Sequence, residues 1–432
     1  MKKYNAITFV LIFVTLIIFA FFSLMLPSIQ VFTFMYKRLY IYLIPLFIFL
    51  IIGITKNKKL KFNYTDLFFL LYIIFCILSC FLNSKTNLTI FGKFNRDEGL
   101  ITLLFYFLLY FFVEKVVNRN NIKKYIKYIQ LFAIIQAFIG IIQSYFNVFA
   151  YFDHMAFAFS GNPNMYGLLM ATISILSLSL FLFKDNSKLN LITFILCYIA
   201  LLLSESSGSF FPYCLMILII LIKYFLKNKK RKNIILIFLS LIFLFPIIQY
   251  SNYYVNTKIH HKTLYINSPY ITADIELIFS KIFNNNYNIS TNLEGKKDSF
   301  QESYSPANGR LYLWNKCFYI GKTHLLFGIG LDRVMVYDIN KIDIANSKSY
   351  DKCHNNYLEI FSSTGIFPLI CYLSFILSII YISYKSKNTI AKCLSYSFIL
   401  YSIIIGVTIS TPLVAIYYYA IIGMIRGLEN EV

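Results

Sequence analysis

Long apolar runs and one large polar interruption constrain what this chain can fold into. Runs such as 6–26, 39–54 and 234–248 are long enough, or nearly so, to cross about 30 Å of hydrocarbon at about 1.5 Å per residue. Residues 251–352, by contrast, are mostly polar. Only 14% of the residues are charged and 58% are hydrophobic, whereas a soluble domain carries about 25% charged residues. The sequence therefore predicts an all-α polytopic membrane protein.

We predict about twelve transmembrane helices, with one large extracytoplasmic loop between helices 9 and 10. Their approximate limits are 6–26, 39–55, 65–83, 99–113, 129–148, 165–183, 189–204, 209–226, 233–250, 356–384, 389–409 and 412–426. Three parts follow. Residues 1–250 hold helices 1–9, residues 251–355 form the loop with part of an active site, and residues 356–432 hold helices 10–12 and a short tail. The first apolar run is expected to be retained, because no small-x-small cleavage site follows it.

The distribution of basic residues orients these helices. Lys and Arg gather in alternate short connections, of which residues 227–232 are an example. By the positive-inside rule these connections are cytoplasmic, which places both termini inside and the large loop outside the cytoplasmic membrane. The same residues account for the formal charge of +21. We therefore expect anionic membrane lipid, and not nucleic acid, to meet this charge.

Motifs for soluble cofactors are absent from the sequence. It contains no glycine-rich phosphate loop, no nucleotide fingerprint and no spacing of zinc ligands. An outward-facing enzyme without a nucleotide must use a donor that is already activated, so we expect neither a cofactor nor a metal ion. Cys317 and Cys353 are the cysteines in or beside the large loop. They could pair, although sequence does not fix their separation.

Three short polar places face the same side as the large loop. Arg96 lies in a charge cluster before a helix, which suits either a solvated turn or an anion at the membrane surface. Asn162 and Asn164 precede another helix, where they can cap it or help to bind an anion. Glu205 lies in a turn of small residues between two helices. A carboxylate so close to a bilayer usually has a partner or a function.

The large loop is the fourth polar place. Arg310 and Trp314 are four residues apart on a predicted amphipathic helix, 309–320, which would lie on the membrane interface. A turn follows at 328–330. His354 then stands at the mouth of the next apolar segment, among Asn355, Tyr357 and further polar residues. A lone histidine is often structural, but these neighbours can orient an imidazole for catalysis.

Four segments in this order resemble the O-antigen ligase and O-antigen polymerase superfamily. They read FNRDEGL, GNPNMYG, NGRLYLWNKCFYIGKTHLLFGIGLDRV and CHNNYLEIFSSTGIFPLICYL, and the resemblance covers residues from about 91 to 369. The last two are the most specific. They combine Arg-x-x-x-Trp, a Gly-x-Gly turn, His-Asn-x-Tyr-Leu and a Gly-Ile hairpin. The layout of the predicted helices around one large outer loop is similar to that of the family.

The resemblance implies a glycosyltransferase that moves a saccharide from undecaprenyl pyrophosphate to an acceptor sugar at the outer face of the membrane. The acceptor would be lipid-linked, part of the wall or attached to protein. The family's arginine and histidine fall on Arg310 and His354, which we predict to be catalytic. The guanidinium suits pyrophosphate oxygens, and a neutral imidazole can accept a proton from a hydroxyl. Residues predicted to bind substrate are Arg96, Asn162, Asn164, Glu205, Trp314, Asn355 and Tyr357.

One position departs from the family pattern. Many members carry an arginine in a Ser-Arg-Gly turn between helices seven and eight, where this chain has Ser206-Ser207-Gly208. If Ser207 replaces that arginine, one cationic contact to pyrophosphate is missing. Arg96, Lys93 or Arg333 would then have to supply it, or the activity differs.

Two alternatives remain at this stage. The motifs do not separate a polymerase, which extends a lipid-linked glycan, from a ligase, which moves a finished one. A transporter or flippase of lipid-linked oligosaccharide belongs to a different class. It predicts charged residues within several spans and repeat symmetry between halves, neither of which the sequence favours.

Overall fold

The computed structural model describes residues 62–83, 87–92, 96, 98–146, 155–227, 231–260, 271–272, 275, 308–334 and 352–429. The predicted spans 6–26 and 39–55 and most of the large loop lie outside these residues. Within them the regular structure is helical throughout. Each span predicted from residue 65 onward coincides with a helix, except 356–384, which is divided into two. The total of twelve spans stays a prediction.

Five helices of the described part are long and apolar enough to cross a membrane. They are α3 (Tyr64–Leu82), α6 (Ile122–Phe146), α7 (Pro163–Phe183), α9 (Ser207–Lys227) and α16 (Ile366–Lys385). Two shorter apolar helices are α8 (Lys188–Leu203) and α17 (Thr389–Ile404). Helices of this length and composition are typical of a membrane protein.

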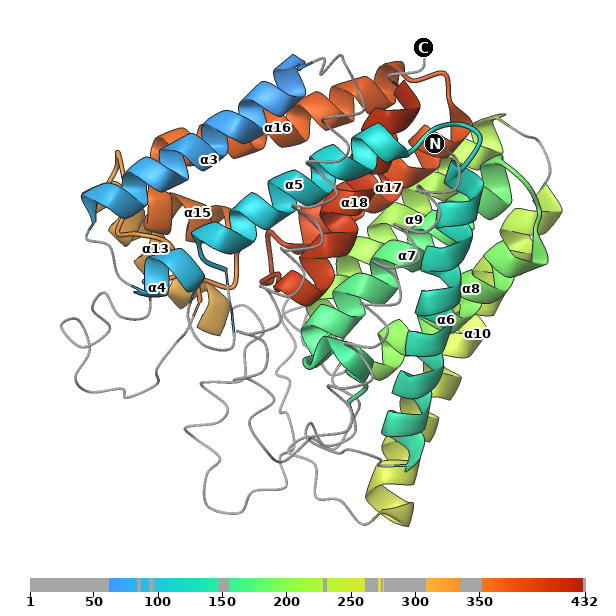
Figure 1. The fold of residues 1–432 in the computed structure, drawn as a ribbon. Helices are drawn as coiled ribbons and strands as arrows, with labels where there is room; N and C mark the ends of the chain where they lie inside the picture. Colours follow the sequence, from blue (N-terminus) through green and yellow to red (C-terminus); the bar gives the residue numbers. More distant parts are fainter. Residues whose placement is uncertain are drawn as a thin grey trace, which may run out of the picture. The chain divides into compact units, whose positions relative to one another are not determined.

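The chain forms two compact units. The first contains residues 1–123, 312–395 and 405–432, and the second contains residues 124–311 and 396–404. In the first unit α3 packs along α16, while α5 (Leu100–Val116) packs along α18 (Pro412–Glu429). Figure 1 shows both pairs as long helices lying side by side. The short helices α4 (Asn87–Phe91), α13 (Asn308–Thr323) and α15 (Asn356–Thr364) also contribute to this unit, which shares α13 and α17 with the second.

Aromatic rings and close backbones hold the first unit together. Phe69 of α3 contacts the rings of Tyr110, Phe375 and Tyr419, which come from α5, α16 and α18. A Cβ on Gly423 of α18 would lie 2.6 Å from the carbonyl oxygen of Tyr110. The absence of a side chain there lets α18 approach α5 closely, as small residues do between membrane helices.

In the second unit α7 is the central helix. It packs against α8 and α9, and α10 (Arg231–Tyr254) packs against α8. Almost every residue of α7 is buried, so its serines and threonines need partners inside the protein. Ser174 meets the Tyr213 hydroxyl at 2.8 Å. Gln130 of α6 donates to Asn190 at 2.8 Å. Such interhelical hydrogen bonds are common between membrane helices.

Three helix boundaries differ from prediction. The helix predicted at 356–384 is divided at Gly365, whose φ of 94° few L residues adopt. A Cβ on Gly365 would lie 2.3 Å from the Leu326 carbonyl oxygen, so the break also brings two backbones together. α6 begins at Ile122, earlier than predicted, and α10 continues beyond residue 250 into a π-helical turn, Val255–Ile259.

Candidate active site

His354 lies on a segment whose backbone is held by hydrogen bonds on both sides of it. The φ angle of His354 is 52°, in the left-handed region. The amide of Cys353 donates to Glu359 Oε2 at 2.9 Å, and that of Asn356 donates to the Ile405 carbonyl at 2.8 Å. A non-glycine residue held in this conformation costs about 1–3 kcal/mol and persists where surrounding contacts enforce it. The contacts around His354 supply that enforcement.

The Asn355 side chain begins the helix that follows. Its Oδ1 accepts hydrogen bonds from the amides of Tyr357 and Leu358 at 3.0 and 3.1 Å. Asn355 is therefore the N-cap of α15, and the residue before it is His354. The predicted helix mouth is confirmed, with the histidine immediately outside the first turn.

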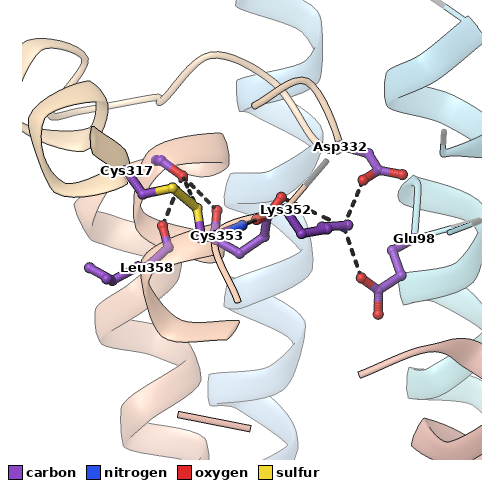
Figure 2. A network of polar contacts seen from close by, with 8 residues as sticks. Glu98, Cys317, Asp332, Lys352, Cys353 and Leu358 are labelled. Carbon is purple, nitrogen blue, oxygen red and sulfur yellow. Dashed lines mark hydrogen bonds and ion pairs between the residues drawn. A yellow bond between two sulfur atoms is a disulfide. The ribbon is translucent and has the colours of Figure 1, made fainter. Parts of the chain in front are cut away.

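Lys352, two residues before His354, lies among three carboxylates. Its Nζ is 2.6 Å from Asp332 Oδ1, 2.9 Å from Glu98 Oε2 and 3.6 Å from Glu359 Oε1. Figure 2 shows the ammonium pointing between Asp332 and Glu98. The Lys352 side chain is 2% exposed. We call these four residues the Lys352 cluster. It joins the start of α5, the turn after Gly330 and α15 to the His354 segment.

The contacts within the Lys352 cluster shift the pKa values of Lys352, Glu98 and Glu359. Burial raises the pKa of Glu98 and of Glu359, although the nearby ammonium opposes this shift. Burial alone would lower the pKa of Lys352, but Asp332, Glu359 and Glu98 together hold it well above its usual value. Three acids around one cation carry excess negative charge, so neutral Glu98 or Glu359 is favoured. The ammonium stays charged throughout the neutral range.

A disulfide lies between the Lys352 cluster and His354. Cys317 of α13 is bonded to Cys353, with their Cα atoms 6.1 Å apart. The pair that the sequence left open is therefore formed, and Figure 2 shows it beside Lys352. Ile329 and Val334 are buried against it. This bond fixes the His354 segment to α13.

Trp314 connects α13 to the same segment. Its Nε1 donates a long hydrogen bond, 3.4 Å, to the backbone carbonyl of His354. Trp314 is half-buried, whereas Phe318 and Tyr319 on the same helix are more than half exposed. The indole thus supports the His354 backbone, and the exposed rings leave α13 an apolar outer face of the kind that suits a membrane interface.

The predicted turn at 328–330 docks on the end of α15. The amides of Ile329 and Gly330 donate to the carbonyls of Ser362 and Ser363 at 3.1 and 2.7 Å. A Cβ on Gly328, whose φ is 58°, would lie 2.3 Å from the Ser363 carbonyl carbon. The Gly-x-Gly pattern is therefore a packing requirement. It satisfies the last carbonyls of α15, the helix that begins beside His354.

In the second unit, two of the polar places meet. Asn162 accepts from the Asn164 amide at 2.9 Å and is the N-cap of α7. The Asn164 side chain accepts from the Ser206 hydroxyl at 3.0 Å. Glu205, with φ of 52°, is 7% exposed and accepts from the Ile271 amide at 3.2 Å. The capping role of Asn162 is confirmed, and Asn164 ties α7 to the turn 204–209.

Arg310 lies against this turn. A Cβ on Gly208 would be 3.2 Å from Arg310 Nη1 and 3.6 Å from Nη2. The guanidinium therefore packs over Gly208, the residue after Ser207. The chain lacks the arginine expected at position 207, yet it brings the Arg310 guanidinium to that place. A cation beside a turn of small residues and backbone amides is suited to an anion such as a phosphate.

One family model matches part of the chain. Residues 192–373 match the O-antigen ligase family model. They include the turn 204–209, Arg310, Trp314 and His354. This segment is similar to the O-antigen ligase family. A search among curated proteins finds no match to the chain.

The remaining predicted residues lie in different parts of the structure. Tyr357 lies in α15, and burial raises its pKa to about 12, so its hydroxyl stays protonated. Arg96 is partly exposed in the turn before α5, outside the family match but in the first unit. Arg333, considered as a substitute cation, donates to the Asn83 carbonyl at 2.5 Å.

The sequence did not single out Lys352, Asp332 or Glu98. Each looked like an ordinary charged residue in a polar stretch. One signal was present, because Lys352 lies two residues from His354 and Glu98 lies two residues from Arg96. Among the described residues, no group of three or more His, Cys, Asp or Glu side chains is placed to hold a metal ion.

Proposed function

We propose that this protein is a membrane glycosyltransferase that moves a glycan from undecaprenyl pyrophosphate to an acceptor saccharide during synthesis of a cell-surface polysaccharide. The observation that carries the proposal is His354. It stands in a left-handed conformation at the mouth of α15, inside the family match. Strained residues of this kind cluster at active sites. Arg310 belongs to the same matched segment.

Arg310 is proposed to bind the donor pyrophosphate. A guanidinium presents a planar fork to phosphate oxygens, and its charge opposes the charge that develops on the leaving group. The guanidinium lies against Gly208, which has no side chain to keep it away from the backbone of the turn. Asn164, Glu205 and the serines of the turn are proposed to fix the donor's sugar and phosphate groups beside it.

His354 is proposed to be the general base. The acceptor hydroxyl oxygen attacks the anomeric carbon of the donor sugar while the bond from that carbon to the pyrophosphate oxygen breaks. The hydroxyl proton passes to the imidazole, and undecaprenyl pyrophosphate leaves with the bonding electron pair. The pyrophosphate supplies the driving force, so the reaction requires no nucleotide. Asn355, Trp314 and Tyr357 are proposed to shape the acceptor side.

The reaction is proposed to take place at the outer face of the cytoplasmic membrane. The Cys317–Cys353 disulfide supports this orientation, because such bonds persist in oxidising compartments and are rare in the cytosol. Basic residues in the connection between α16 and α17 support a cytoplasmic location for the opposite end. The disulfide and the charges thus agree on which end faces outward.

Deletion of the protein tests the proposal. Undecaprenyl-linked glycans would be extracted from the deletion strain and sized by mass spectrometry. Long chains left on the lipid indicate a ligase, and single repeats indicate a polymerase. Restoration by the wild-type protein but not by His354→Ala at equal abundance supports the assignment. Unchanged lipid-linked glycans in the deletion strain contradict it, and their accumulation on the cytoplasmic leaflet would indicate a flippase.

A further inference from the structure

Lys352 is more deeply buried than its sequence context suggests. Its side chain is 2% exposed and its ammonium contacts carboxylates from three separate segments. Removing one member of such a buried ionic group leaves uncompensated charge, which is far more disruptive than losing an exposed pair. The Lys352 cluster therefore acts as a rigid junction between α5, the turn at 331–333 and α15.

The junction lies next to the proposed catalytic residue. Lys352, Cys353 and His354 are consecutive, and the first two have their side chains fixed by the cluster and by the disulfide. Glu98, which pairs with Lys352, follows Arg96 by two residues. The contact of Lys352 with Glu98 therefore couples the segment that carries Arg96 to the segment that carries His354.

We propose that Lys352 is a positioning residue for His354, acting through the Lys352 cluster to hold the imidazole where it meets the acceptor hydroxyl. This proposal rests on the proposed function of His354. Lys352 does not touch the substrate in this account. It fixes the backbone two residues upstream, and a displacement of about 1 Å at a reacting group can cost about 10²-fold in rate.

The test compares Lys352→Met with Lys352→Arg in the purified full-length protein in lipid vesicles. Lys322→Met, at an exposed lysine of α13, is the matched control. Two quantities are measured for each variant. One is the kcat and its pH profile for glycan transfer. The other is the rate at which diethyl pyrocarbonate modifies His354, read by mass spectrometry with His324 as the internal reference.

Lys352→Met is expected to lower kcat by about 10²-fold, to move the pH profile and to change the modification rate of His354 but not of His324. Lys352→Arg should change each of these three quantities less than Lys352→Met does, because arginine keeps the positive charge. Lys322→Met should behave as wild type. A folded Lys352→Met protein with the wild-type kcat, pH profile and His354 modification rate overturns the proposal.

A second variant is used if Lys352→Met fails to fold. If Lys352→Met does not accumulate, Glu98→Gln removes one partner while leaving Lys352 with two carboxylates, and the same two measurements decide. The two proposals fail in different ways. Full transfer activity in His354→Ala removes the role of His354 as general base, and absence of glycan transfer by the wild-type protein removes the proposed function. An unchanged His354 modification rate in the Lys352 or Glu98 variant removes the positioning role alone.

Discussion

Lys352 Nζ lies 2.9 Å from Glu98 Oε2, across 254 residues of sequence. This contact joins two polar segments that the sequence presents as separate motifs. One carries Arg96 and the other carries His354. In the described first unit, the proposed base is therefore supported by the same ionic cluster that fixes the start of α5.

The orientation of the chain can be tested with engineered thiols. Tyr319 on α13 is 58% exposed, and Lys387 lies exposed between α16 and α17. We expect a membrane-impermeant maleimide added to intact cells to label Tyr319→Cys and to miss Lys387→Cys. Labelling of both in opened membranes is the control. Reversed labelling would contradict the outward placement of His354.

Arg310 should contribute through its forked guanidinium. Arg310→Ala is expected to lower kcat/KM. The decrease should correspond to a loss of about 2–4 kcal/mol of transition-state stabilisation, which is the scale of a single oxyanion contact. Arg310→Lys should recover only part, because an ammonium is not planar. Gly208→Ala places a Cβ 3.2 Å from Nη1 and should cause a smaller loss. Lys322→Ala on the same helix is the control. Wild-type turnover in Arg310→Ala would remove it from the site.

Gly365 should be among the least replaceable residues. Its φ of 94° and the 2.3 Å approach of a Cβ to Leu326 mean that Gly365→Ala combines backbone strain with a clash. We expect a loss well above the 1–3 kcal/mol of strain alone. Gly161→Ala is the matched control, since Gly161 has φ of 68° with nothing within 4 Å. Equal midpoints of thermal unfolding for the two variants would contradict this packing.

The Lys352 cluster predicts a pH dependence of stability. The raised pKa values of Glu98 and Glu359 contribute stability that is fully present below their ordinary value of 4.5 and is lost as the pH rises through the raised values. Lys352, with its pKa also raised, contributes at every pH below 10.5 and loses its contribution only in strongly alkaline solution.

The midpoint temperature of unfolding should therefore decrease as the pH rises above the ordinary carboxyl value of 4.5. Trp314 reports it by fluorescence, because it is the single Trp and contacts the His354 carbonyl. Glu98→Gln removes one group with a raised pKa and should flatten the slope. An equally steep slope in Glu98→Gln would argue against the ionisation assigned to Glu98.

In this protein the sequence predicts the long helices better than the breaks within them. Long apolar runs mark α7, α8 and α9 to within a few residues, because burial in lipid requires continuous apolar helices. The N-cap role of Asn162 and the turn at 328–330 follow from local chemistry. The break at Gly365 was missed, because apolar residues continue on both sides of it and its cause is the Leu326 backbone.

Only part of the candidate site could be predicted from the sequence, because local patterns do not show contacts between distant residues. His354 and Arg310 stood out by residue type and by resemblance to a family. The Lys352 cluster depends on contacts between residues far apart in sequence, and no local pattern marks such a contact. The Cys317–Cys353 bond and the packing of Arg310 over Gly208 likewise required the fold, because spacing alone does not give a distance.

The central claim is that His354 removes the proton from the acceptor hydroxyl during glycan transfer. The most direct measurement is single-turnover transfer in vesicles that contain the purified protein, with lipid-linked glycan as donor, comparing wild type with His354→Ala and His324→Ala. We expect His354→Ala to slow transfer by about 10²–10⁴-fold while the donor still binds, and His324→Ala to match wild type. Transfer at the wild-type rate by His354→Ala would contradict the account.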